Sequence, residues 1–355
     1  MATYDIAVIP GDGIGPEVTE AAMGVLDRLG DRYGFGLERT VYDWGTERYL
    51  DGGAMMPDDA LARLEPADAI FLGAVGHPEV PDHITLNGLL LPIRKSFDQY
   101  VCKRPNTLFE GIESPLRGYG GGDIDFVVYR ENTEGEYANV GGREHRGFDH
   151  EVAVQSALFT RRGTERIVRR AFEAAAEREG RLTSVTKSNA QAHSMVFWDD
   201  IVGEVSEEFP AVDVERLLVD RASMDLVRRP EEFDVIVASN LFGDITTDIA
   251  AIVTGSLGLA PSGNLNPDGE YPSMFEPVHG SAMDIVGEGV ANPLASVLTG
   301  ALLFDHLGGE GEDDAAADLR DAVEAQLADG DAPRTPDLGG ESGTEDVIAD
   351  LEDRV

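Results

Sequence analysis

The sequence predicts an α/β protein, in which short strands alternate with helices along the chain. Apolar runs bounded by glycine or proline recur, and the segments between them carry helical periodicity. The chain has 355 residues, enough for two ordinary domains or one large α/β domain with a substantial core. The strand candidates are residues 6–9, 69–72, 125–128, 182–185 and 235–238.

The helix candidates lie between these strands. Segments 165–178 and 202–209 have helical periodicity, and Asn292-Pro293 followed by an apolar run to residue 307 predicts a helix with proline in its first turn. The glycine-rich stretch 118–122 and the polar segment 131–149 are candidates for a loop or a projecting arm that contacts a partner chain.

Charge excludes one large class of function. The chain carries 28 Lys and Arg against 67 Asp and Glu, a formal charge of −39, whereas nucleic-acid binding requires a basic face. Only Lys95, Lys103 and Lys187 are lysines. This acid-rich, lysine-poor composition favours a protein adapted to concentrated salt, where screening removes self-repulsion. The alternative is an acidic protein of ordinary cytoplasm.

Other features predict a folded, soluble, cytoplasmic protein. Hydrophobic residues make up 42% of the chain, which argues against disorder. Cys102 is the only cysteine, so no intrachain disulfide can form. The first residues lack the basic and apolar regions of a secretion signal, and no apolar run approaches the roughly 18 residues of a membrane span.

Residues Gly11-Asp12-Gly13-Ile14-Gly15 follow the first strand, but they do not form a Rossmann fingerprint. That fingerprint requires G-x-G-x-x-G, whereas here the third glycine comes one position early and proline follows it. We therefore predict a tight strand-to-helix loop whose backbone approaches a ligand.

Two aspartates, Asp244 and Asp248, follow the apolar run 235–238 at the start of a predicted helix. Residues four apart lie on one helix face, about 5–6 Å apart at Cβ. Such carboxylates can share one divalent cation, and hard oxygen ligands suit magnesium or manganese. In so acidic a chain, a solvated helix face is the alternative.

Five other polar residues stand at the ends or turns of predicted elements. Arginine forks hold carboxylates, so Arg94, Arg104 and Arg130 together could hold a substrate with two carboxylates. Lys187 ends a strand before a polar turn, where burial would favour a general base, and Tyr137 lies seven residues beyond Arg130. Singly, each of them could be a surface ion pair or a packing residue.

With these features and the block from Glu276 to Asp284, the chain resembles the β-decarboxylating dehydrogenases of 2-hydroxy acids, the family of isocitrate and 3-isopropylmalate dehydrogenases. The resemblance covers about residues 4–345 and is strongest to the tartrate dehydrogenase/decarboxylase and D-malate dehydrogenase branch. Its most specific motifs are residues 83–86, 90–94, 97–101, 123–128, 132–137 and 335–340.

The resemblance implies an isopropylmalate-dehydrogenase-like fold of two domains, with a mixed sheet flanked by helices, and not a Rossmann fold. Residues 1–100 and 255–355 would form a discontinuous cofactor-binding domain. Residues 101–254 would bind substrate and metal and mediate dimerisation, with an arm near residues 131–160.

The resemblance also implies roles for the polar residues. Arg94, Arg104 and Arg130 match the arginines that grip the substrate carboxylates. Asp244 and Asp248 match metal ligands, and Asp220 matches a third ligand that the neighbouring subunit supplies. Lys187 matches the base, also given across the dimer interface, and Tyr137 matches the acid that protonates the enolate.

For the cofactor, the resemblance favours NAD, because a carboxylate at Asp284 would accept hydrogen bonds from the ribose hydroxyls and repel a 2′-phosphate. Met283 departs from the family pattern, which usually has proline there. The remaining cofactor-binding candidates are Gly73, Gly76, Asn189, His279, Gly280 and Asn292.

We therefore expect NAD-dependent oxidative decarboxylation of a 2-hydroxy dicarboxylic acid, with Mg²⁺ or Mn²⁺ and K⁺ as an additional candidate. D-malate is the first substrate candidate and tartrate the second. Asn87, where relatives read the group at C3, fits neither the glutamate nor the tryptophan usual there. The alternatives are 3-isopropylmalate dehydrogenase, a non-catalytic regulatory subunit and a metal-dependent phosphohydrolase. We expect a homodimer with shared active sites, or a higher oligomer.

Overall fold

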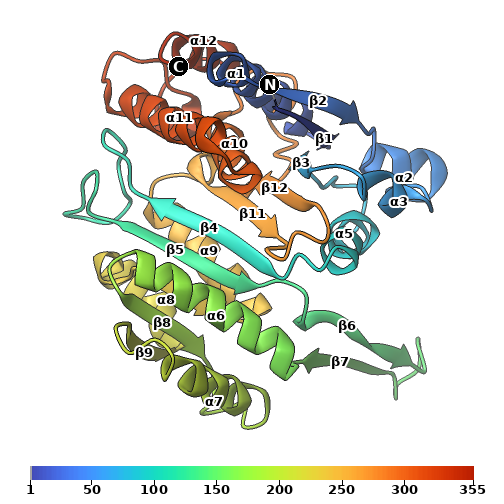
Figure 1. Ribbon diagram of the computed structural model, residues 1–355. Coiled ribbons are helices and arrows are strands. Elements are labelled where there is room, and N and C mark those ends of the chain that lie inside the picture. Colours follow the sequence, from blue (N-terminus) through green and yellow to red (C-terminus); the bar gives the residue numbers. More distant parts are fainter. Residues whose placement is uncertain (1) are drawn as a thin grey trace. The chain divides into compact units, whose positions relative to one another are not determined.

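The computed structural model describes residues 2–355, which form two compact units (Figure 1). The first unit contains the chain up to residue 99, residues 104–124 and residues 251–355, and the second contains residues 100–103 and 125–250. Strand β4 (Val101–Thr107) begins in the second unit and ends in the first.

Residues 104–124 correct the sequence-based boundary, which placed them with residues 101–254. Their hydrogen bonds explain why they belong to the first unit. The Ser114 hydroxyl donates to the Val253 carbonyl at 2.7 Å, and the Arg334 guanidinium donates to the Gly111 carbonyl at 2.8 Å. These bonds join the segment to the C-terminal third of the chain.

The sheet of the first unit is mixed. Its strands follow the order β2-β1-β3-β12-β11, and all neighbours are parallel except β11 and β12. All six residues of β3 are buried, as expected for a strand covered on both faces. The strands are β1 (Ala2–Gly11), β2 (Phe35–Val41), β3 (Ala69–Ala74), β11 (Pro261–Leu265) and β12 (Ser273–Pro277).

Helices cover this sheet, and α10 (Leu294–Leu307) is the most deeply placed of them. It is buried continuously from Leu294 to Phe304 and packs against α1, α11, β11 and β12, as an almost wholly apolar helix should. The other helices of the unit are α1 (Gly15–Tyr33), α2 (Thr46–Gly52), α3 (Ala60–Leu64), α4 (Asp82–Thr85), η1 (Leu86–Leu90), α5 (Leu91–Ser96), η3 (Leu257–Leu259), α11 (Glu310–Ala328), η4 (Pro336–Leu338) and α12 (Thr344–Glu352).

The second unit contains a parallel sheet of order β5-β10-β8-β9. The carboxyl ends of parallel strands meet at one edge, and there β5 ends with Arg130 and Glu131, β8 ends just before Lys187, and β10 leads into α9. The strands are β5 (Asp125–Glu131), β8 (Arg181–Thr186), β9 (Asp213–Leu218) and β10 (Val235–Ala238). The helices are α6 (Arg161–Glu177), α7 (Ser194–Ser206), α8 (Val219–Arg228), η2 (Pro230–Glu232) and α9 (Asn240–Val253).

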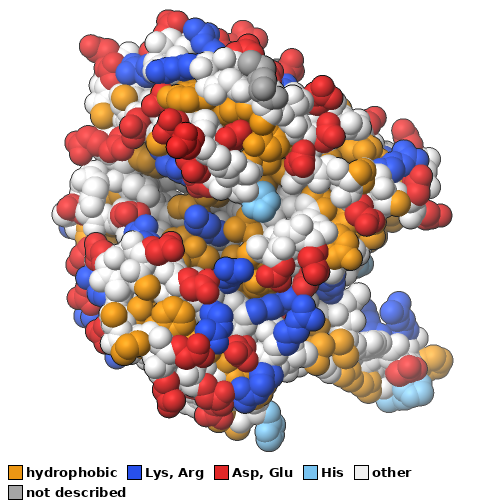
Figure 2. Space-filling model, in the orientation of Figure 1, with side chains coloured by type: hydrophobic (Ala, Val, Ile, Leu, Met, Phe, Trp, Pro, Cys, Tyr) orange, Lys and Arg blue, Asp and Glu red, His pale blue; other side chains and the backbone are white. Residues whose placement is uncertain are grey.

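A hairpin separate from this sheet occupies the range where the sequence predicts an arm. It consists of antiparallel β6 (Gly135–Glu144) and β7 (Val152–Leu158), and every residue of β7 is exposed. Hydrophobic side chains lie along it (Figure 2). Those of Val140, Phe148, Val152, Val154 and Leu158 are exposed to solvent.

The predicted α/β class and its mixed sheet are confirmed. Each of the five predicted strands coincides with or lies within an observed strand, and the helix predicted at residue 292 begins as α10 at Leu294. None of the helices in residues 2–355 is long and apolar enough to cross a membrane. Figure 2 shows acidic side chains over much of the visible face, with Lys and Arg gathered over α6. On that helix, Arg161 and Arg169 form ion pairs with Glu204 and Glu208.

Candidate active site

Three of the predicted site residues meet at the start of α9. The Asp244 carboxylate forms an ion pair with the Arg130 guanidinium and accepts a hydrogen bond from the Tyr137 hydroxyl at 2.8 Å. The Arg130 guanidinium carbon lies 5.5 Å from the centre of the Tyr137 ring. Asp248 follows one turn later on the same helix and is exposed. The strand end, the arm and the helix therefore each contribute one member of the cluster around Asp244.

A second pair forms at the end of β8. The Lys187 ammonium donates to the Asp220 carboxylate at 2.6 Å, and Asp220 lies in the first turn of α8. The Lys187 side chain is 27% exposed and that of Asp220 is 58% exposed. The hydrogen bond from Lys187 lowers the pKa of the Asp220 carboxyl below its ordinary value. The predicted base and the predicted third metal ligand are thus partners within one chain.

The predicted metal ligands do not form one complete group in a single chain. Among residues 2–355, no three His, Cys, Asp or Glu side chains are placed to hold a metal ion together. Asp244 and Asp248 share the helix α9, whereas Asp220 lies on α8 beside Lys187. Both sets offer only hard oxygen donors, the type that Mg²⁺ and Mn²⁺ prefer.

In the first unit, two predicted arginines are buried. Arg94 on α5 is 6% exposed and forms an ion pair with Glu276, which also accepts a hydrogen bond from the Asn264 amide at 2.8 Å. Arg104 on β4 is 7% exposed, and its Nε donates to the Ser262 hydroxyl at 3.4 Å. Sequence reasoning missed Glu276 as the partner of Arg94. The available signal was an acidic residue directly after the apolar pair Met274 and Phe275 in a short strand.

Asn87 lies on η1, a single π-helical turn between α4 and α5. Such turns are rare and occur frequently at functional sites. The Asn87 amide nitrogen donates to the His83 carbonyl at 2.7 Å, and the side chain is exposed. Because a carbonyl can only accept, this bond fixes the amide orientation and leaves the Asn87 Oδ1 as the acceptor facing outward from its own helix.

The glycine loop after β1 packs against the block that contains His279. The Ile14 amide donates to the Ser281 carbonyl at 2.9 Å. Asp12, which is 5% exposed, accepts hydrogen bonds from the Thr46 amide at 2.8 Å and from the Gly76 amide at 2.9 Å. Three loops that are distant in sequence therefore join around Asp12, a residue that sequence reasoning left without a role.

His279 offers an acceptor to a ligand. Its Nδ1 lies 3.0 Å from the Gly280 carbonyl, so Nδ1 carries the proton and Nε2 is the acceptor of a neutral ring. Burial lowers the pKa of His279, with the Gly280 carbonyl and Asp337 acting in the opposite direction. Within residues 2–355, the buried Nε2 has no hydrogen-bond partner. A buried acceptor of this kind calls for a donor from outside the chain.

The other cofactor candidates have different surroundings. Gly73 is buried in β3, where a Cβ would lie 2.3 Å from the Pro10 carbonyl oxygen, so close packing requires glycine there. Asn292 uses both polar atoms within the protein, donating to Asp337 at 2.9 Å and accepting from the Leu294 amide at 3.0 Å. Gly280 and Asp284 in the first unit and Asn189 in the second are exposed.

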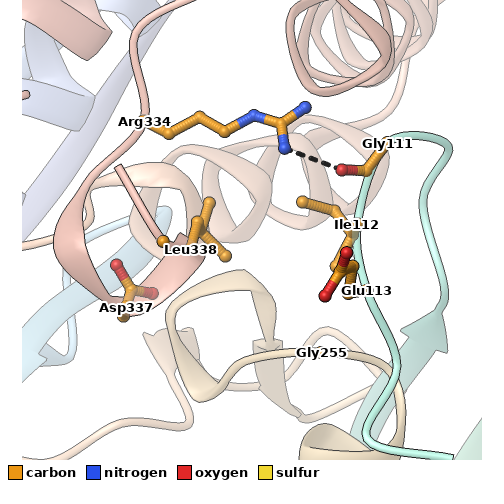
Figure 3. A pocket seen from close by; sticks show the side chains of 8 residues that line it. Gly111, Ile112, Glu113, Gly255, Arg334, Asp337 and Leu338 are labelled. Carbon is orange, nitrogen blue, oxygen red and sulfur yellow. Dashed lines mark hydrogen bonds between the residues drawn. The ribbon is translucent and has the colours of Figure 1, made fainter. Parts of the chain in front are cut away.

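Asp337 also borders a cavity of about 480 Å³ in the first unit (Figure 3). Its carboxylate accepts hydrogen bonds from Ser256, Asn292 and Thr335. In Figure 3, Arg334 reaches across the cavity to the Gly111 carbonyl. The sequence motif at residues 335–340 therefore supplies both a wall of this cavity and the partner of Asn292.

The whole sequence decides the family. Residues 5–351 match the isocitrate/isopropylmalate dehydrogenase family. A probable tartrate dehydrogenase/decarboxylase of Agrobacterium vitis is 51% identical over 349 residues, covering 98% of this chain and 96% of that protein. The chain belongs to the isocitrate/isopropylmalate dehydrogenase family.

Further comparisons agree with this membership. The decarboxylating D-malate dehydrogenase of Escherichia coli strain K12 is 49% identical over 352 residues, covering 98% of this chain and 97% of that protein. The crystal structure of isocitrate dehydrogenase from Methylococcus capsulatus superposes with a TM-score of 0.88 at 34% identity, covering 99% of both chains. As a member of the isocitrate/isopropylmalate dehydrogenase family, the chain is an oxidative decarboxylating dehydrogenase.

Proposed function

We propose that the protein catalyses the NAD-dependent and divalent-metal-dependent oxidative decarboxylation of a 2-hydroxy dicarboxylic acid, with D-malate as the first candidate and tartrate as the second. The observation that carries the proposal is the cluster at Asp244. An arginine, a tyrosine hydroxyl and a candidate metal ligand meet there, and the helix that carries Asp244 also carries a second carboxylate, Asp248. Relatives about 50% identical to the chain are named for tartrate and D-malate.

The carboxylates fit a divalent cation. Asp244 and Asp248 would hold it from α9, with Asp220 of a second copy as the third ligand, because one chain does not bring all three together. When bound, Mg²⁺ or Mn²⁺ would supply Lewis-acid polarisation of the carbonyl at C2, and NAD would supply the hydride acceptor. K⁺ remains an additional candidate.

The arginines would bind the two substrate carboxylates. Arg94, Arg104 and Arg130 are each less than 10% exposed, and a buried guanidinium binds a carboxylate more strongly than an exposed one. Arg94 and Arg130 already face carboxylates, those of Glu276 and Asp244, which hold them in defined orientations. A diacid would therefore meet charges that are positioned before it binds.

Lys187 and Tyr137 would move the protons. Lys187 would accept the proton of the substrate hydroxyl, a step that requires a neutral amine, and its nitrogen now donates to Asp220. Engagement of Asp220 as a metal ligand would remove that carboxylate from Lys187. After carbon dioxide leaves, the Tyr137 hydroxyl, 2.8 Å from Asp244, would deliver a proton to carbon.

Two features of the first unit support NAD as the cofactor. The buried Nε2 of His279 can accept a hydrogen bond from an adenine amino group, and the exposed Asp284 carboxylate can accept from ribose hydroxyls while repelling a 2′-phosphate. Gly76, Gly280, Asn292 and Asn189 are further candidates. Asp337, which binds Asn292, would support the same subsite.

Asn87 bears on the choice among the candidate substrates. Its Oδ1 is an acceptor that suits a hydroxyl at C3, as in tartrate, and malate differs from tartrate only in lacking that hydroxyl. An acceptor amide is a poor surface for the branched alkyl group of 3-isopropylmalate. The position therefore supports the malate and tartrate candidates over the isopropylmalate alternative.

We further propose a homodimer in which each copy supplies Lys187 and Asp220 to the other, with a higher oligomer as the alternative. The apolar side chains of the β6–β7 arm support it, because contiguous exposed apolar surface marks protein–protein contact. The acid-rich, lysine-poor composition of the whole chain supports a protein adapted to concentrated salt.

The decisive experiment measures NADH formation with Mn²⁺ or Mg²⁺ in high potassium chloride across D-malate, tartrate, 3-isopropylmalate and isocitrate. Turnover of D-malate or tartrate that depends on metal, and is lost in Lys187→Met, is the expected result. Turnover of 3-isopropylmalate alone would reassign the substrate. No turnover of any acid would refute the enzymatic proposal and favour a regulatory subunit, and phosphate-ester hydrolysis instead would favour a phosphohydrolase.

A further inference from the structure

The side chain of Arg130 is held by α9 at more than one point. Asn240, the first residue of α9, accepts hydrogen bonds at its Oδ1 from Arg130 Nε at 3.1 Å and from Nη2 at 2.7 Å. The remaining terminal nitrogen, Nη1, pairs with Asp244. Asn240 and Asp244 are four residues apart, so they present their oxygens on one helix face.

Between them on the same face, Gly243 makes room for the aliphatic stem of Arg130. A Cβ at position 243 would lie 2.6 Å from Arg130 Cγ and 2.7 Å from Arg130 Cβ, closer than real carbon atoms approach. Any side chain at this position would therefore push Arg130 away from α9. Arg130 is 2% exposed, so it has little room to move.

Asn240 also connects Arg130 to the segment that leads to Tyr137. Its Nδ2 donates to the Glu134 carbonyl at 3.0 Å, one residue before β6 begins. An arginine can only donate and a carbonyl can only accept, so the residue between them must accept on one side and donate on the other. An amide does both at this reach, whereas aspartate lacks the donor and leucine lacks both groups.

We propose that Asn240 and Gly243 are positioning residues, which set Arg130 for the substrate carboxylate without touching the substrate themselves. The inference rests on the proposed role of Arg130 in binding the diacid. Asn240 is the anchor that does not depend on Asp244, so Arg130 keeps two of its bonds when the Asp244 carboxylate is engaged elsewhere. In the run Asn-Leu-Phe-Gly-Asp at residues 240–244, the first, fourth and fifth residues all contact Arg130 or make room for it.

The kinetic test compares Asn240→Ala and Gly243→Ala with Thr246→Val. Thr246 is buried on the same helix and donates to the Phe242 carbonyl at 2.7 Å, so its loss perturbs α9 without touching Arg130. Both test variants should raise KM for D-malate about tenfold or more, the effect of losing hydrogen bonds to a charged group, with KM for NAD unchanged. The Thr246→Val control should leave both KM values near those of the wild type.

Two further measurements test whether displacement of Arg130 causes the rise in KM for D-malate. In an Arg130→Lys background, Asn240→Ala should add much less than it does alone, because contacting residues are not additive. Crystal structures of Asn240→Ala and Gly243→Ala should show the Arg130 guanidinium displaced. If the wild type turns over no diacid, the proposed function fails, and the crystal structures still decide the positioning. An unmoved guanidinium, or equal effects on both KM values, would overturn the inference.

Discussion

Removing the Glu276 carboxylate from its ion pair with Arg94 should destabilise the first unit strongly, because a buried charge is left without its partner, and the change Glu276→Gln measures this. Both side chains are less than 10% exposed, and Glu276 also accepts from Asn264. Removing one partner of a buried pair costs about 3–5 kcal/mol, because the other charge stays buried. Glutamine keeps an oxygen acceptor, so we expect the free energy of unfolding to fall by about 2–3 kcal/mol.

Glu312→Gln is the matched control. Glu312 is 6% exposed, close to the 7% of Glu276, but its partner is the neutral Tyr4 hydroxyl at 2.8 Å. Burial, followed by this hydrogen bond, raises the pKa of Tyr4 to about 12, so the hydroxyl stays protonated. Glutamine keeps an oxygen acceptor for this neutral hydroxyl, so Glu312→Gln should lower the free energy of unfolding by about 1 kcal/mol or less.

Urea unfolding measures both variants at one potassium chloride concentration and one protein concentration, because association shifts apparent stability. If the free energy of unfolding falls equally in the two variants, or falls more in Glu312→Gln, the cost of Glu276→Gln does not come from leaving the buried charge of Arg94 unpaired.

Three further outcomes are expected. Asp284→Lys should raise the ratio of kcat/KM with NADP to that with NAD, and an unchanged ratio would refute the role of this carboxylate. Burial holds the pKa of His279 in the folded protein below its ordinary value of 6.5. Below about pH 6.5 the unfolded chain therefore binds a proton that the folded chain does not, and the free energy of unfolding decreases as pH falls toward the folded pKa. In urea unfolding, His279→Gln should reduce this dependence of stability on pH. Val154→Glu on the arm should dissociate the proposed dimer, as measured by sedimentation, whereas Val41→Glu, also at an exposed strand position, should not. Dissociation by both or by neither would contradict an arm-mediated dimer.

Most of the fold could be predicted because its strands carry a local signal. Buried parallel strands are continuous apolar runs, and residues 69–72 and 235–238 lie in strands whose every residue is buried. The boundary at residues 104–124 could not be predicted, because that segment is fixed by Ser114 and Gly111 through partners more than a hundred residues away. Local patterns carry no record of such pairings.

In the candidate site, too, some residues could be predicted from the sequence and others could not. Asp244 and Asp248 could be found because helical spacing alone places them on one face. Glu276, Asp12 and Asp337 were missed as organisers, because each acts through residues that only the tertiary structure brings near, such as Arg94 for Glu276. Asn240 lies four positions before Asp244 in the sequence, but the residue it binds, Arg130, is 110 positions earlier, so no local pattern could reveal the contact.

Two of the carboxylates that the proposed function assigns to the metal, those of Asp220 and Asp244, are each paired with a cationic side chain. Asp220 is paired with Lys187, one of three lysines in the sequence, and Asp244 is paired with Arg130. Under the proposed function, engagement of these carboxylates as metal ligands would release Lys187 from its ion pair and would free one nitrogen of Arg130 for the diacid. Asn240 would keep the guanidinium in place. Because linkage is reciprocal, metal and diacid should then strengthen each other's binding. Calorimetry can measure this coupling without NAD, and D-malate affinity that is unchanged by Mg²⁺ would show that the ion pairs do not couple the two sites.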